Sequence, residues 1–364
     1  MFSGGGPFQH ALKARVNAEL TPDRLRAGRI RVIAKSTFIM LWAFSSYFAL
    51  ILWADTPLTV IPLAISLAFA MGGIGFAIGH DANHGAFVGG TRTNRSVGLT
   101  FDLIGASSYV WRTKHNTAHH SFTNVVGADS DIDQMPFARF APDQPRRAFH
   151  RWQHIYVWFL YGGFTLKYHF MGDILQILGG RIDGMTKLPK PSRGELAIFI
   201  VGKVFFWTWA IIIPLILHPF WAVLGVFLLC SFIMGITIAT VFQLAHCVDE
   251  AEFTSVEKLR AEETTKNWAV HQVETTVDFA TGNKFLAWYL GGLNFQIEHH
   301  LFPKVCHVHY PRLIKVIRET CEEHGVTHVD QPTLRSALLS HARWLREMGR
   351  ADEQVPVVSA QLTA

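Results

Sequence analysis

Four apolar runs with almost no charged residues are the strongest constraint on how this chain folds. A helix of about 18 or more apolar residues can cross a bilayer, because it satisfies its own backbone polar groups. The runs come in two pairs, and only two residues separate the members of each pair. We therefore predict an all-α integral membrane protein with four transmembrane helices in two hairpins. The expected spans cover residues 36–54, 57–79, 196–217 and 220–245.

The overall composition agrees with a membrane protein. Only 17% of the residues are charged, against about 25% in an ordinary soluble domain. The mean hydropathy of +0.21 excludes an intrinsically disordered chain. The four cysteines are far apart and form no Cys-x-x-Cys pair. This spacing favours neither a disulfide framework nor a zinc site built from thiolates.

The distribution of basic residues predicts the orientation of the chain. Seven lysine and arginine residues precede the first span, whereas the two short connections contain none. By the positive-inside rule, both termini and the long middle loop are cytoplasmic. The formal net charge of +5 suits a surface near anionic membrane lipid, and we expect no nucleic-acid partner. We divide the chain into a cytoplasmic N-terminal segment, a membrane domain, and a cytoplasmic helical region with a tail, at residues 1–35, 36–303 and 304–364.

Two features of the middle of the chain need predictions of their own. Apolar stretches near residues 97–110, 155–165 and 285–295 are too short to cross, so we expect interfacial or buried helices there. Lys203 lies inside the third span, near its cytoplasmic end. A long lysine side chain in such a position normally extends back to water, so we predict that Lys203 snorkels.

The 19 histidines are the unusual feature of this composition, and the predicted topology places eight of them at the same membrane surface. His80 and His84 are four residues apart, as are His115 and His119, so each pair lies on one face of a helix. His120 then points about 100° away from His119, so the adjacent pair can serve two different ions. The candidate metal ligands are His80, His84, His115, His119, His120, His246, His299 and His300.

Eight imidazole ligands are more than one tetrahedral or octahedral ion can bind. A site with two metal ions is therefore the simplest interpretation. The absence of clustered cysteine disfavours structural zinc and iron–sulfur chemistry. Imidazole binds iron, zinc, copper and nickel, so the residue type alone does not name the metal. Nearby acidic residues either accept hydrogen bonds from the ring N–H groups or are solvated loop acids. These residues are Asp81, Asp129, Asp131 and Glu298.

The histidine clusters and their neighbours carry a specific resemblance. Residues 296–303 read Gln-Ile-Glu-His-His-Leu-Phe-Pro, and residues 119–124 read His-His-Ser-Phe-Thr-Asn. Over residues 79–303 these motifs resemble the membrane-bound fatty acid desaturase superfamily, in its front-end, linoleoyl-CoA desaturase-like branch. The resemblance implies two iron ions held by the seven histidines of three motifs. It also implies that His246 is a further ligand and that Gln296 is at most a weak or indirect one.

The resemblance also implies an activity and its partners. The expected enzyme is an oxidoreductase of lipid metabolism that uses O2 to introduce a double bond into a fatty acyl chain. The chain would be carried by coenzyme A, acyl carrier protein or a glycerolipid. No His-Pro-Gly-Gly haem motif of a fused cytochrome b5 domain occurs, so we expect electrons from a separate ferredoxin or cytochrome b5-type protein. We expect a bacterial inner-membrane protein with its diiron site on the cytoplasmic side.

An acyl substrate would also require a shaped tunnel. A saturated chain has no polar handle near the reacting carbons, so its position must be set by apolar walls. Aromatic side chains are candidates for these walls, although in membrane proteins they also serve as packing residues and interfacial anchors. The candidates are Trp111, Trp158, Tyr161, Trp207 and Trp209.

Other functions fit parts of this pattern. A diiron hydroxylase or acetylenase of the same superfamily would use the same histidine motifs, and their spacing does not separate these reactions from desaturation. A haem-binding membrane electron carrier or a metal transporter would need histidines inside opposed spans. The four predicted spans contain none. A fatty acyl desaturase is therefore the function that the sequence favours.

Overall fold

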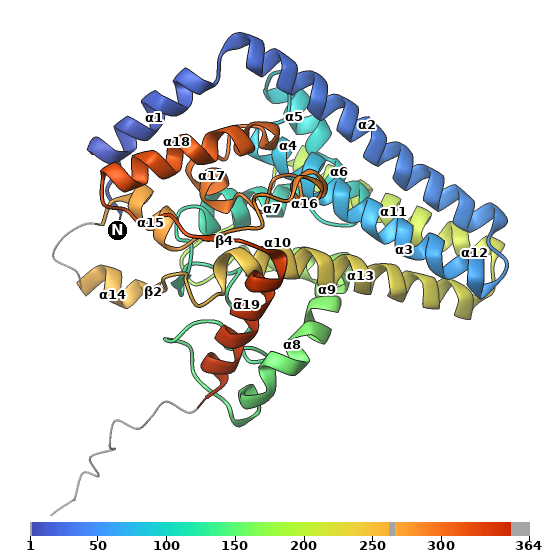
Figure 1. The fold of residues 1–364 in the computed structure, drawn as a ribbon. Helices are drawn as coiled ribbons and strands as arrows, with labels where there is room; N and C mark the ends of the chain where they lie inside the picture. Colours follow the sequence, from blue (N-terminus) through green and yellow to red (C-terminus); the bar gives the residue numbers. More distant parts are fainter. Residues whose placement is uncertain (1, 262–265, 351–364) are drawn as a thin grey trace, which may run out of the picture.

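The computed structural model describes residues 2–261 and 266–350 and is mostly helical. Figure 1 shows long helices extending together from a body of shorter ones. Four helical stretches are long and apolar enough to cross a membrane, which confirms that part of the fold prediction. They cover Pro22–Trp53, Pro57–His84, Arg193–Leu217 and Phe220–His246.

Two of the four stretches change their hydrogen-bonding pattern along their length, whereas α2 (Pro22–Trp53) and α13 (Phe220–His246) are uninterrupted α-helices. The second stretch comprises α3 (Pro57–Ile74), the π-helix η1 (Gly75–Gly79) and α4 (His80–His84). The third comprises α11 (Arg193–Trp207), the π-helix η4 (Thr208–Ile212) and α12 (Ile213–Leu217). The second and fourth stretches both end on a candidate ligand, so these long helices position the histidines directly.

Helix α2 begins well before the apolar run that predicted it. The side chain of Thr21 accepts a hydrogen bond from the backbone N–H of Arg24, and Pro22 occupies the first turn. Both features are typical of a helix N-terminus. Because no breaker follows, the basic segment continues into the apolar helix, and α2 packs along α3 after a short connection.

The shorter elements form the body that carries the histidines. Between the second and third long stretches lie α5 (Thr91–Gly98), α6 (Thr100–Leu103), α7 (Ser108–Trp111), the π-helix η2 (Arg112–His119), the 3-10 helix η3 (Ala148–Trp152), α8 (Gln153–Gly162), α9 (Phe164–Phe170) and α10 (Gly172–Gly179). After α13 come α14 (Val256–Ala261), α15 (Trp268–Glu274), α16 (Lys284–Tyr289), α17 (Gln296–Leu301), the 3-10 helix η5 (His307–His309), α18 (Tyr310–Glu323) and α19 (Leu334–Gly349). The N-terminal α1 (Pro7–Glu19) packs on α18.

Two short parallel strand pairs tie loops of this body together. Strand β1 (Val125–Val126) pairs with β2 (Thr254–Ser255), with Val125 opposite Thr254. Strand β3 (Asp278–Phe279) pairs with β4 (Asp330–Gln331), with Asp278 opposite Asp330. Each pair joins segments that are distant in the sequence and so fixes the loops that surround the histidines.

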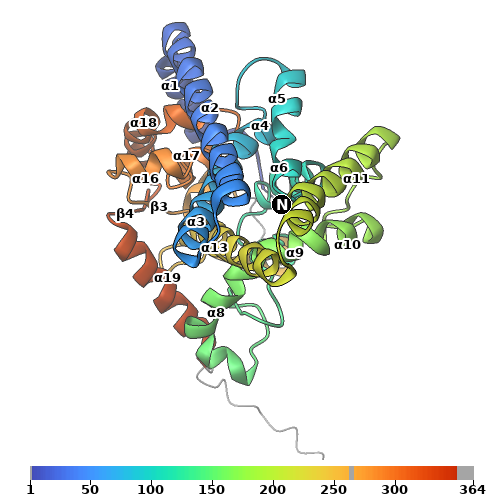
Figure 2. The same cartoon turned by 90° about the vertical axis from the view of Figure 1, so that its right-hand side faces the viewer.

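The long helices bury one face against each other and expose large apolar side chains on the other. The buried side includes Ile39, Ile74 and Phe206, each at most 2% exposed. Near the ends away from the histidines, Leu58 is 87% exposed and Trp221 is 77% exposed. A soluble surface rarely shows such patches, so this surface suits lipid. Figure 2 shows α13 between α11 on one side and α16 and α18 on the other.

The prediction that Lys203 snorkels to water is wrong. Lys203 is 5% exposed, and its Nζ lies 2.8 Å from an Oδ2 of Asp173 in α10. The same ammonium donates to the backbone carbonyls of Gly105 and Tyr168, at 2.8 and 2.6 Å. A buried partner and two carbonyls satisfy the charge, so the side chain has no need to reach water.

Candidate metal centre

The structure brings together all eight histidines that the sequence singled out. They come from α4, η2, the residue after η2, the end of α13, and α17. Every one of them is buried, with at most 7% of its surface exposed. Segments separated by up to about 200 residues therefore meet at one centre that excludes bulk water.

Seven of the eight histidines form two groups, and within each group one ring nitrogen per residue lies within 4.8 Å of the others. The first group contains His80, His84, His115 and His299. The second contains His119, His246 and His300. His120 forms a further group with His299 and His300, one from each of these two groups, and its ring centroid lies 4.7 Å from that of His299 and 4.3 Å from that of His300. Two adjoining groups fit the predicted dinuclear count.

The segment that carries His115 and His119, and that ends just before His120, is a π-helix and not the α-helix assumed from the spacing. The backbone N–H of His120 donates to the carbonyl of His115, five residues earlier, at 3.0 Å. This wider turn brings the Nε2 atoms of His115 and His120 to 3.2 Å from each other. His120 therefore faces His115, whereas an α-helical turn would direct the two rings differently. Hydrogen-bond register, and not residue spacing, decides this arrangement.

Seven of the eight histidines have a buried ring nitrogen without a hydrogen-bond partner. These atoms are His80 Nδ1, His84 Nε2, His119 Nε2, His120 Nδ1, His246 Nε2, His299 Nε2 and His300 Nε2. A buried polar atom without a partner costs about 1–3 kcal/mol, and such atoms are rare in native proteins. Their grouping fits metal ligands, because iron readily takes imidazole nitrogen.

The electrostatics of the centre keep most of its imidazoles neutral. Burial, followed by the neighbouring histidines, lowers the pKa of His115, His120, His299 and His300 well below 6.5. A neutral imidazole offers the lone pair that a metal ion requires. The donor set in the structure therefore fits the two iron ions that the resemblance implies.

Hydrogen bonds from the surrounding residues orient the rings. The Nδ1 of His119 lies 2.9 Å from a carboxylate oxygen of Asp129, which is itself buried. Burial lowers the pKa of His119 but the Asp129 carboxylate raises it, and the net direction is upward. The Nδ1 of His300 lies 2.8 Å from the amide oxygen of Gln272. Because each Nδ1 is engaged, each Nε2 is the nitrogen left for a metal ion.

Asp81 lies next to the centre but is engaged elsewhere. Its nearest carboxylate oxygen is 3.9 Å from His80 Nδ1, beyond hydrogen-bond distance. The other oxygen lies 2.7 Å from His307 Nδ1, and His307 Nε2 lies 2.8 Å from Lys35 Nζ. We missed this buried hydrogen-bonded series of Lys35, His307 and Asp81 in the sequence. Lys35 and His307 are 272 positions apart, and no sequence pattern predicts their contact.

Asp131 also has a stronger partner than a histidine ring. Its carboxylate lies 2.5 Å from Lys114 Nζ and 3.9 Å from the Nδ1 atoms of His115 and His119. Lys114 also donates to the hydroxyl of Tyr168 at 2.6 Å. The carboxylate is thus neutralised by a lysine and balances the charge beside the centre.

Glu298 and Gln296 precede the last two histidines but point to different neighbours. The carboxylate of Glu298 lies 3.5 Å from His328 Nε2, and burial raises the pKa of Glu298 to about 7. The amide nitrogen of Gln296 donates to the carbonyl of Leu293 at 2.8 Å. Gln296 also lines a cavity together with His80 and His299, so it lies beside the centre.

A cavity of about 560 Å³ adjoins the histidines. His80, His115 and His299 form part of its wall. The rest is mainly apolar and includes Phe76, Ile104, Met234, Ile238 and Phe242. Two of the predicted tunnel residues, Trp111 and Tyr161, line this cavity. Its size and lining suit a long hydrocarbon chain.

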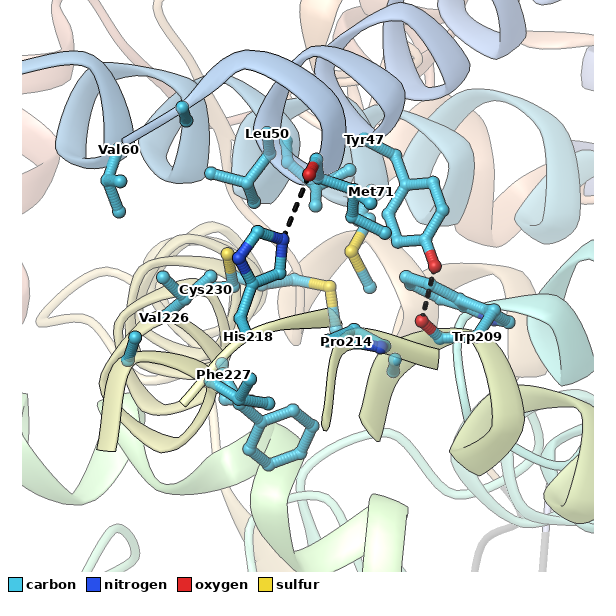
Figure 3. Close-up of a pocket in the computed structure, with 18 of the residues that line it drawn as sticks. Tyr47, Leu50, Val60, Met71, Trp209, Pro214, His218, Val226, Phe227 and Cys230 are labelled. Carbon is cyan, nitrogen blue, oxygen red and sulfur yellow. Dashed lines mark hydrogen bonds between the residues drawn. The ribbon is translucent and has the colours of Figure 1, made fainter. Parts of the chain in front are cut away.

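A second and smaller cavity, of about 110 Å³, lies farther along the long helices. Figure 3 shows His218 and Tyr47 beside it, and both bond to backbone carbonyls. His218 Nε2 lies 2.9 Å from the carbonyl of Ile51, and the Tyr47 hydroxyl donates to the carbonyl of Trp209 at 2.6 Å. Of the remaining tunnel candidates, Trp209 lines this smaller cavity. Within the described residues, Trp158 and Trp207 line neither cavity.

Comparison with known proteins identifies the family. A family model described as fatty acid desaturase matches residues 55–332. The sn-1 linoleoyl-lipid 6-desaturase of Arthrospira platensis is 35% identical over 358 residues, 96% of each chain. The enzyme of the same name from Synechocystis sp. is 35% identical over 349 residues, 94% of this chain and 96% of the relative. The acyl-lipid (8-3)-desaturase of Physcomitrium patens is 38% identical over 347 residues, 94% of this chain and 72% of the relative.

These findings show that the chain belongs to the fatty acid desaturase family. It is an oxidoreductase of fatty acid metabolism, as the histidine motifs indicated. The histidine clusters fit the iron site of such an enzyme.

Proposed function

We propose that this protein inserts a double bond into an acyl chain of a membrane glycerolipid, using O2 and two iron ions held by the eight histidines. One observation carries the proposal: the histidines that hold seven buried and unpartnered ring nitrogens lie together, beside an apolar cavity of about 560 Å³. The choice of glycerolipid is supported by the three relatives above, whose names specify linoleoyl-lipid or acyl-lipid substrates.

The residues of the chain hold the reactants in place. Bound to the histidines, iron would supply the activation of O2. Two hydrogens from adjacent methylenes, two electrons from an external ferredoxin or cytochrome b5-type protein and two protons from water would together reduce one O2 to two water molecules. Asp129 and Gln272 fix the rings of His119 and His300. The apolar wall, including Ile238, excludes water and holds the acyl chain beside the histidines.

The proposal also includes how the protein is placed in the membrane. The four long helices cross the membrane as two hairpins, with the histidines and both termini on the cytoplasmic side of a bacterial inner membrane. The seven basic residues before the first apolar run support this orientation. The exposed apolar surface of the long helices supports lipid contact.

A lipid analysis tests the proposed function. The protein is expressed in a bacterial host with a ferredoxin system, and double bonds in the host lipids are located by mass spectrometry. We expect a new double bond that is absent with His119→Ala and with His299→Ala. His218→Ala is the matched control, because His218 is bonded to a backbone carbonyl in the other cavity, and it should give the wild-type lipid profile.

Each other outcome changes the proposal in a defined way. A new hydroxyl or triple bond would keep the iron site but replace desaturation by hydroxylation or acetylenation. Loss of the product in His218→Ala, with His119→Ala still active, would contradict the assignment of the metal centre. Iron analysis of the same membranes separates a missing electron donor from a missing metal.

A further inference from the structure

The exposure of its lining residues locates a mouth of the large cavity. Of the residues that line it, most are buried or half-buried, and only five are exposed. The five exposed lining residues are Asp133, Phe137, Phe159, Leu160 and Lys167. They come from the loop after β1 and from α8 and α9, so the cavity opens between these segments.

The surroundings of this mouth are apolar on their outer side. Phe159 in α8 is 71% exposed, and Phe137 in the loop is 63% exposed. Met171, between α9 and α10, is 60% exposed, and Leu178 in α10 is 79% exposed. Short helices with such exposed apolar residues lie in the membrane interface, so the mouth faces the lipid and not open water.

Lys167 is the one positive charge among the five exposed residues of the mouth. Within the described part of the chain, its ammonium has no hydrogen bond or ion pair. The other lysine of this cavity, Lys114, is by contrast fully engaged by Asp131 and the Tyr168 hydroxyl. The carboxylates of Asp131 and Asp133 are near enough for their charges to act on Lys167, but neither forms an ion pair with it. The ammonium therefore keeps its hydrogen-bond donors for an oxygen of an incoming molecule.

The polar part of the cavity lies on the same side as the mouth. Asp131 and Gln134 belong to the mouth loop, and Tyr168 follows Lys167 in α9. Asp131 is only 3.9 Å from two histidine rings, so the polar side of the cavity reaches the centre. A lipid whose polar end stays at this side would place carbons near its ester, and not near its methyl end, beside the histidines.

We propose that Lys167 is a positioning residue that binds the glycerol end of a membrane glycerolipid as the acyl chain enters sideways from the bilayer. This inference rests on the proposed function. It adds the site that determines which carbons of the acyl chain lie beside the histidines. The acceptor is an oxygen of the lipid, supplied either by the acyl ester carbonyl or by a head-group phosphate. Lys114 then neutralises Asp131, so that the carboxylate does not repel the lipid.

Kinetics with defined lipids test this role. The variants Lys167→Met and Lys167→Arg are assayed in mixed micelles of phosphatidylglycerol and, separately, of the uncharged monogalactosyl diacylglycerol. We expect Lys167→Met to raise KM about tenfold, the worth of one charge-assisted hydrogen bond, with kcat and iron content nearly unchanged. Its products should also spread over neighbouring double-bond positions. Lys167→Arg should restore both. Lys315→Met, at a side chain that is 82% exposed on α18, is the control for loss of one surface charge.

The two lipids separate the sources of the acceptor oxygen. An effect with both lipids assigns the ester carbonyl, and an effect with phosphatidylglycerol alone assigns the phosphate. An unchanged KM with both lipids overturns the proposal, as does a parallel loss of iron and kcat, which would indicate a structural role. If the wild type binds iron but forms no product, the proposed function fails. Retention of phosphatidylglycerol by the iron-free protein, measured by native mass spectrometry, still tests Lys167, and equal retention by Lys167→Met overturns its role.

Discussion

The two cavities described above, one beside the histidines and one farther along the long helices, differ in how their polar groups are satisfied. Around the smaller one, His218 and Tyr47 bond to backbone carbonyls. Around the larger one, ring nitrogens of the histidines face each other without partners. A satisfied polar group stabilises a packed apolar region, whereas a cluster of unsatisfied ones is stable only with a ligand. The comparison thus separates histidines that support the fold from histidines that are candidate metal ligands.

His169, between the two cavities, shows that an unpartnered ring nitrogen alone does not indicate a metal ligand. His169 lines both of them and is 2% exposed, and neither of its ring nitrogens has a partner. It belongs to neither of the two histidine groups described above. Burial lowers its pKa to about 3, so the ring is neutral. An unpartnered nitrogen therefore indicates a metal ligand only where several of them converge.

The largest expected effect is at a convergent histidine. His300→Ala should reduce activity at least a hundredfold, because loss of a residue that merely orients a ligand already costs about 10- to 100-fold in metal affinity or activity. Iron per chain should fall in parallel, while membrane insertion measured by extraction should not change. Full iron content in this variant would remove His300 from the ligand set.

Asp129→Asn tests the residue that orients a candidate ligand, His119. The amide keeps the shape but removes the charge opposite His119 Nδ1, so we expect iron affinity to fall about 10- to 100-fold. Competition with a chelator measures this change. Asp133→Asn, at an exposed position of the same loop, is the matched control and should leave iron affinity as in the wild type.

Lys203→Met tests the buried ion pair between Lys203 and Asp173. Removing the ammonium leaves the Asp173 carboxylate buried without its partner, which destabilises proteins by about 3–5 kcal/mol. Thermal unfolding in detergent should show the loss. The double variant Lys203→Met with Asp173→Asn should recover part of it, because the uncompensated charge is gone. No recovery would mean that the pair contributes through packing alone.

His169→Leu and His218→Gln should have the smallest effects on stability. They test the comparison at histidines that belong to neither of the two groups. Leucine at position 169 replaces an unsatisfied polar ring, so stability should stay the same or rise slightly. Glutamine at position 218 loses the bond to Ile51 and should cost about 1 kcal/mol. Both variants should keep the wild-type iron content. A loss of iron in His169→Leu would show that convergence is not required for a ligand.

Much of this account could be predicted from the sequence, because the relevant signals are local. Apolar runs of the required length predicted the four long helices, since backbone satisfaction in lipid leaves few other choices. Pairs such as His80 and His84 share a helix face whatever surrounds them. Their convergence with His299 followed from topology alone.

The parts that the sequence did not predict depend on contacts between distant segments. The π-helix around His115 is a choice of hydrogen-bond register that residue spacing does not encode. Lys203 was expected at the water surface because its partner, Asp173, lies 30 residues away on another helix. Trp158 and Trp207 were chosen by residue type, which does not tell a tunnel wall from ordinary packing.

Metal analysis of the purified protein tests the central claim most directly. The protein is purified without oxygen, supplied with Fe²⁺, and examined for iron stoichiometry and by X-ray absorption. The account predicts two iron ions per chain, with nitrogen and oxygen ligands and no sulfur, since none of the four free and buried cysteines belongs to either histidine group, and Cys306 lies instead with Asp81 and His307. One iron ion per chain, or a sulfur ligand to the metal, would contradict it.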